Sequence, residues 1–166
     1  MEIKDFDIEK LRKKFNNLKD VILRLGVYKN YRVLETGSGN FVYSVIGNTQ
    51  GWYSVVCFYN NLNNLEIYDM HVFKRYQERY LKKRCYDNFE LINSFLERNS
   101  DGIVYLEEDN KMSKKIKDGI CLGEIDLDLG VIYNKTFIVE EQLTLKQNYL
   151  ISDVDYRREA IHGSTS

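Results

Sequence analysis

Proline is absent from this chain of 166 residues, and cysteine occurs only three times. Cys57, Cys85 and Cys121 are odd in number and far apart, which argues against a disulfide framework and against a zinc motif with paired ligands. We therefore expect free thiols and no bound metal. No apolar run approaches the ~20 residues of a membrane span, and the N-terminal residues lack the basic-then-apolar layout of a secretion signal. The sequence predicts a cytoplasmic protein with no membrane partner.

A strong net charge is also lacking, because 24 basic and 25 acidic residues leave a formal charge of −1. Nonspecific nucleic-acid binding is driven by displaced counterions, so any nucleic-acid contact has to be local. Hydrophobic residues make up 43% and charged residues 30%, which is typical of a folded chain rather than a disordered one. The length fits one ordinary domain. We expect a single α+β domain over residues 1–155 and a disordered tail over residues 156–166.

The hydrophobic pattern predicts one helix followed by strands. Apolar residues recur at steps of three and four from residue 7 to residue 25, and Gly26 is a natural stop. One face of this helix should therefore pack on a sheet. That face has Ile8, Leu11, Phe15, Leu18, Ile22 and Leu25. Short β-branched and aromatic runs predict four antiparallel strands at 31–35, 41–46, 52–59 and 65–70, and three more at 103–106, 119–125 and 131–139.

Two helices are expected between these groups of strands. Phe73, Tyr76 and Tyr80 return to helical spacing, and Asp87 begins a capping box for a second helix that Gly102 follows. Residues 140–143 are expected to open a short final helix. The predicted fold class is α+β, with an N-terminal helix packed on a largely antiparallel sheet and two central helices between a four-strand and a three-strand segment.

A basic stripe is the most suggestive chemical feature of the chain. His71, Arg75 and Arg79 are four residues apart, which places them on one face of a helix. From residue 71 to residue 84, six basic residues stand against one acidic residue, a local charge of +5. A histidine can move a proton near neutral pH, and arginine can hold phosphate oxygens. Each residue also has a plain structural interpretation, His71 as a capping or packing residue and the arginines as a solvated face paired with Glu78.

Other residues are secondary candidates. Lys74 adds a phosphate contact on the same helix, and Lys135 or Thr136 on the last strand adds a phosphate contact or a hydroxyl donor if that strand neighbours the helix. The Gly37-Ser38-Gly39 turn lacks the following helix of a nucleotide-binding loop, so no cofactor is expected. The aromatic residues Trp52, Tyr53 and Tyr59 can stack on bases, although aromatic strand residues more often belong to a core.

The segment from Met70 to Arg79, together with Lys135-Thr136-Phe137-Ile138, resembles small RelE-like and barnase/EndoU-like toxin nucleases of phages and mobile elements. The resemblance covers residues 70–147. It implies that His71, Arg75, Arg79 and Thr136 are catalytic. The chain departs from this family in having four predicted strands before His71 and in being less basic.

Two functions from different classes remain open. The first is metal-independent RNA cleavage, with His71 as general acid or base, Arg75 and Arg79 on the phosphate, and Thr136 or Lys135 assisting. The second is a non-enzymatic phage or mobile-element protein that grips nucleic acid or an acidic protein partner with the same basic helix. The many tyrosines favour the second, because aromatic residues are enriched at protein interfaces.

Overall fold

The computed structural model describes residues 2–36, 39–47, 51–59, 65–83 and 87–140. The short helix expected after residue 140 and the tail at 156–166 lie outside these residues. Nine strands form one sheet in the order β1-β2-β3-β4-β5-β9-β8-β7-β6. Their bounds are Val27–Tyr28 (β1), Tyr31–Thr36 (β2), Gly39–Gly47 (β3), Tyr53–Tyr59 (β4), Leu65–Asp69 (β5), Ile103–Leu106 (β6), Lys111–Lys115 (β7), Ile120–Asp126 (β8) and Val131–Ile138 (β9).

The sheet consists of two antiparallel meanders that meet at its centre. Strands β1 to β5 form the first meander and β6 to β9 the second, and β5 and β9 join them as parallel neighbours. A parallel pair needs a long connection between its strands. Here that connection begins with α2 (Met70–Tyr76), the π-helical turn η2 (Gln77–Leu81) and α3 (Asn88–Asn99).

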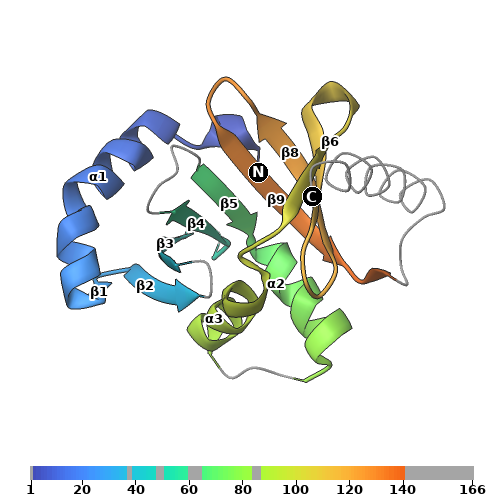
Figure 1. Ribbon diagram of the computed structural model, residues 1–166, viewed down its shortest axis with the longest axis horizontal. Helices are drawn as coiled ribbons and strands as arrows, with labels where there is room; N and C mark the ends of the chain where they lie inside the picture. The colour runs from blue at the N-terminus through green and yellow to red at the C-terminus, as the bar shows by residue number, and fades with distance from the viewer. Residues whose placement is uncertain (1, 37–38, 48–50, 60–64, 84–86, 141–166) are drawn as a thin grey trace, which may run out of the picture.

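The helices cover opposite faces of the sheet. Helix α1 (Ile8–Leu25), after the short 3₁₀ turn η1 (Ile3–Asp5), packs Phe15 and Ile22 against Val56 and Ile67. Helices α2 and α3 pack on the other face, and Figure 1 shows α1, in blue, well away from them. The two cores use alternate residues of the same strands, as strand geometry requires. Gly26 ends α1 with φ +73°, and its N–H donates to the carbonyl of Ile22.

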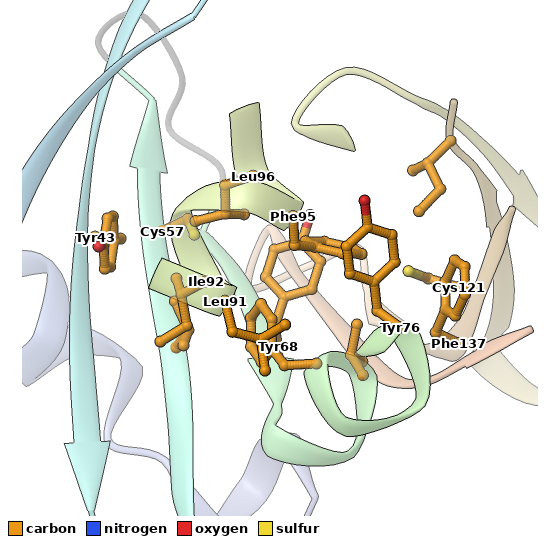
Figure 2. Close-up of a cluster of buried hydrophobic side chains, with 14 of the residues drawn as sticks. Tyr43, Cys57, Tyr68, Tyr76, Leu91, Ile92, Phe95, Leu96, Cys121 and Phe137 are labelled. Carbon is orange, nitrogen blue, oxygen red and sulfur yellow. The ribbon is translucent and has the colours of Figure 1, made fainter. Parts of the chain in front are cut away.

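An aromatic cluster fills the core beneath α2 and α3. Phe95 on α3 lies at the centre, with its ring 5.0 Å from Tyr76 and 5.4 Å from Phe73, both on α2. The same ring lies 5.5 Å from Tyr68 on β5. Figure 2 shows Phe95 on one side of Tyr76 and Phe137 of β9 on the other. This contact between helices and sheet places α2 across β9.

The predicted fold class is confirmed, because an N-terminal helix packs on a mostly antiparallel sheet with helices between its two halves. Two short strands, β1 and β7, lie outside the predicted set. Strand β7 has the sequence Lys-Met-Ser-Lys-Lys, which has no apolar alternation, and its Lys114 is nonetheless 3% exposed. Because a lysine occupies an inward-facing position, the hydrophobic pattern does not predict this strand.

Candidate functional site

Asp69, at the end of β5, fixes the start of α2 next to Trp52. Its Oδ1 accepts hydrogen bonds from the backbone N–H of His71 at 3.1 Å and from the indole Nε1 of Trp52 at 3.2 Å. Its Oδ2 accepts one from the hydroxyl of Tyr133 at 2.8 Å. Burial, together with that hydrogen bond, raises the pKa of Tyr133, so the hydroxyl stays protonated and donates. Three donors on one buried carboxylate make this corner of the sheet rigid.

Trp52 contacts two side chains of α2, His71 and Lys74. The His71 ring meets the indole edge to face, with 4.6 Å between centroids and an interplanar angle of 70°. The Lys74 ammonium lies 5.1 Å from the centroid of the same indole, within range of a cation–π interaction. His71 and Lys74 are exposed, and Trp52 is half-buried. The helix start therefore presents an aromatic face and positive charge at the same place.

An open groove of about 550 Å³ follows the outer face of α2 and η2 from this point. Its lining residues are Lys74, Gln77, Glu78, Lys82 and Lys83. None of the three lysines forms an ion pair with a residue that the structure describes. Three ammonium groups beside one carboxylate give the groove a positive potential, although the whole chain has a charge of −1.

The structure does not bring the side-chain ends of His71, Arg75 and Arg79 together at one place, because each has a different partner. Arg75 pairs with Glu78 at 2.9 Å, and both side chains are exposed. Arg79 turns toward the sheet and donates to the backbone carbonyl of Phe137 at 2.6 Å. The cause is the π-helical turn, which has more residues per turn than an α-helix and so rotates Arg79 out of the expected row. Of the predicted stripe, His71 contacts Trp52, Arg75 forms a surface ion pair, and Arg79 contacts β9.

A β-bulge on β9 decides where Lys135 and Thr136 lie. Leu122 pairs with Thr136 and Gly123 with Asn134, so Lys135 is the extra residue. A Cβ on Gly123 would lie 1.8 Å from the carbonyl oxygen of Tyr133, so the bulge requires glycine there.

Lys135 pairs with Glu124 on β8 and lies over the Tyr133 ring. Phe137 points into the core beneath α2 and α3, so the preceding Thr136 faces the other side of the sheet. The regular alternation of strand residues does not anticipate this bulge. Their side chains are not brought to the α2 face that displays His71.

Two polar clusters were not expected from the sequence. The first surrounds Asp118 in the β7–β8 turn, whose carboxylate accepts hydrogen bonds from the Tyr76 hydroxyl at 2.7 Å and from the Asn99 amide at 3.0 Å. Arg98 adds two more bonds to the same carboxylate. Burial alone would raise the pKa of Asp118, but these hydrogen bonds outweigh it and hold the pKa at about 2. A lone aspartate before Gly119 gives no sequence signal of this role.

The second cluster lies inside the protein, between β5, β7 and β9. Lys114 pairs with Glu66 at 2.6 Å, and both side chains are about 5% exposed or less. The hydroxyl of Tyr68 and the amide of Asn134 also donate to Glu66, at 2.9 Å and 3.0 Å. The carbonyl oxygen Oδ1 of Asn134 is buried without a hydrogen bond among the described residues. This cluster is enclosed by protein, and its hydrogen bonds connect β5 of the first meander to β7 and β9 of the second.

Comparisons of this chain with protein-family models, with curated proteins and with solved structures found no match. The resemblance to toxin nucleases stays a prediction. Among the described residues, no group of three or more histidine, cysteine or acidic side chains is arranged to hold a metal ion. Within the same part of the chain, no helix has both the length and the apolar character needed to cross a membrane.

Proposed function

We propose that the protein binds single-stranded RNA through the face formed by Trp52, His71 and Lys74 and by the lysine groove that continues from it. The observation that supports this most directly is the contact of His71 and Lys74 with one indole, at 4.6 Å and 5.1 Å. Proteins that bind single strands combine aromatic rings, on which bases stack, with basic grooves that follow the phosphates. The two components lie side by side here.

The charge distribution favours a local contact of this kind. The chain as a whole is close to neutral, so it has no long-range attraction for nucleic acid. The groove lysines Lys82 and Lys83 come eight and nine residues after Lys74, just past the end of the same helical segment. They extend the positive surface in one direction from Trp52, which suits a strand running along α2.

Metal-independent RNA cleavage is the second candidate, favoured by the exposure of His71 beside this surface. In that reaction His71 accepts the proton of a ribose 2′-hydroxyl as its oxygen attacks phosphorus. The bond from phosphorus to the 5′-oxygen breaks, and that oxygen takes a proton from water. The products are a 2′,3′-cyclic phosphate and a 5′-hydroxyl. Arg75 can leave its exposed pair with Glu78 at little cost and turn to the phosphate.

Binding is tested by fluorescence anisotropy of a labelled oligouridylate, with oligothymidylate and poly-glutamate as parallel ligands. We expect saturable binding of the RNA that weakens as salt rises, since each phosphate contact releases a counterion. Lys74→Gln and the double variant Lys82→Gln/Lys83→Gln should each weaken binding several-fold. Lys13→Gln removes the same charge from an exposed position on α1 and should not. Binding of poly-glutamate without binding of RNA would mean that the partner of this surface is an acidic protein and not RNA.

Cleavage is tested on the same oligonucleotide in EDTA, by denaturing electrophoresis. A cyclic-phosphate product that disappears in both His71→Ala and Arg75→Ala would establish the second candidate. Intact RNA at saturating protein would leave binding as the function. A product that persists in His71→Ala would rule out His71 as the proton acceptor.

A further inference from the structure

A second groove lies on the opposite face of the sheet, between α1 and the strands β1 to β3. Its volume is about 550 Å³, which is within the range of small-molecule sites. Leucine, valine and isoleucine side chains line part of it, and polar or aromatic residues line the rest. The residues that bear on its chemistry are Tyr28, Tyr31, Ser44, Lys10, Lys14 and Lys29.

Ser44 is the polar group on the sheet side of this groove. It lies on β3 on the same face as Val42 and Ile46, which pack toward α1. Ser44 is only 4% exposed, yet its hydroxyl forms no hydrogen bond with a residue that the structure describes. The Ser44 oxygen is not among the fully buried side-chain atoms that lack a partner, so it keeps access to the groove. A ligand in the groove can therefore form a hydrogen bond with this hydroxyl.

The lysines of the groove are held against aromatic rings rather than carboxylates. Lys14 lies 5.9 Å from the centroid of Tyr31, and Lys29 lies 5.5 Å from that of Tyr28. Neither lysine forms an ion pair with a described residue.

The groove also has two aspartates, but each carboxylate already accepts a hydrogen bond from a backbone N–H. Asp7 accepts the N–H of Lys10 at the start of α1, at 3.0 Å. Asp5 accepts the N–H of Glu2 at 2.7 Å. The lysines are therefore the charged groups of the groove without a hydrogen-bonded partner, and they suit an anion.

We propose that this groove binds a small aromatic anion, in which a flat ring packs on the half-buried Tyr28. A phosphate or carboxylate of the ligand contacts Lys14 and Lys29, and a polar atom accepts or donates a hydrogen bond at Ser44. Nucleotides and aromatic carboxylates share this chemistry. This groove and the lysine groove along α2 share no lining residue, so the site does not depend on the proposed RNA surface.

Isothermal titration calorimetry with four probes tests the proposal: adenosine monophosphate, 1-naphthoate, adenosine and inorganic phosphate. We expect saturable binding of one or both aromatic anions, and at least tenfold weaker binding of adenosine and of phosphate. Binding of the nucleotide alone or of naphthoate alone supports the proposal and identifies the source of the ring. Absence of binding by both aromatic anions overturns it.

Two variants locate the binding. Ser44→Ala removes the hydroxyl and adds no volume, and Lys14→Gln/Lys29→Gln removes two exposed charges without touching the core. Each should weaken binding of the aromatic anion at least fivefold. Lys13→Gln on the outer side of α1 and Lys74→Gln on α2 should bind as the wild type does. Wild-type affinity in the double lysine variant, or an equal loss in Lys13→Gln, overturns the proposal.

Discussion

Arg98 at the end of α3 and Asp118 in the β7–β8 turn form a two-pronged ion pair. The Nε and a terminal nitrogen of the guanidinium donate to the two carboxylate oxygens at 2.8 Å and 2.7 Å. The Asp118 side chain is 2% exposed, whereas that of Arg98 is 43% exposed. Arg98 also donates to the hydroxyl of Tyr80 at 2.9 Å, so the pair ties α3 to the helical segment that leads from the candidate site.

Removal of Arg98 should destabilise the fold. In Arg98→Met the buried carboxylate of Asp118 keeps Tyr76 and Asn99 but loses its charged donor. We expect the free energy of unfolding to fall by about 1–2 kcal/mol, because bonds to charged groups are stronger than neutral ones and Arg98 is partly solvated. Urea denaturation measures this. Arg24→Met, an exposed arginine at the end of α1, is the matched control, and an equal loss in both variants would contradict the role of the pair.

Acid should weaken the protein through the same carboxylate. The pKa of Asp118 is lowered from 3.8 to about 2 in the folded state, so its ionised form stabilises the fold above pH 4. That contribution, about 2 kcal/mol, is lost as the pH falls from about 4 through 2. Urea denaturation between pH 5 and pH 2 should show a steeper loss for the wild type than for Asp118→Asn. Parallel curves for the two proteins would show that Asp118 titrates normally.

Phe15 should be a main source of stability on the α1 face. It is 3% exposed, and its ring stacks on Phe58 with 3.8 Å between centroids and meets Tyr31 edge to face at 5.0 Å. Phe15→Ala should cost ~3–5 kcal/mol through lost burial and a residual cavity. Arg75→Ala, at an exposed ion pair, should change the free energy of unfolding by less than ~0.5 kcal/mol. Thermal melts of both variants check this, and a large loss in Arg75→Ala would make Arg75 structural.

The buried pair of Lys114 and Glu66 should behave as one unit. Lys114→Met leaves an unpaired carboxylate inside the protein and should cost ~3–5 kcal/mol. The double variant Lys114→Met/Glu66→Gln removes both charges and should recover much of that loss. A double-mutant cycle by urea denaturation measures the coupling. Additive losses would mean that the two side chains do not depend on each other.

The sequence predicts the helices and most strands because their hydrophobic periods are regular. Helix α1 follows its apolar stripe, from the cap at Asp7 to the left-handed Gly26. Strand β7 escapes prediction because Lys114, a charged residue, faces inward to meet Glu66 across the sheet. Only the tertiary fold brings these two residues together, and no local pattern reports it.

The candidate site is predicted in part for a similar reason. Residue spacing places His71 and Lys74 on one helix, and composition indicates local positive charge. The partnership with Trp52 depends on Asp69, which joins the end of β5 to the indole, and this requires the finished sheet. The π-helical turn that redirects Arg79 to Phe137 and the bulge at Lys135 are departures from ideal geometry that periodicity cannot anticipate.

The fluorescence of Trp52, the only tryptophan in the chain, gives the most direct test of the proposed RNA surface. Titration with unlabelled oligouridylate at low salt should quench the indole and saturate, because a base that stacks on Trp52 changes its surroundings. Lys74→Gln should shift the titration to several-fold higher RNA, while Lys13→Gln should leave it unchanged. Unaltered Trp52 emission at RNA concentrations that saturate the anisotropy signal would place the RNA elsewhere and contradict the account.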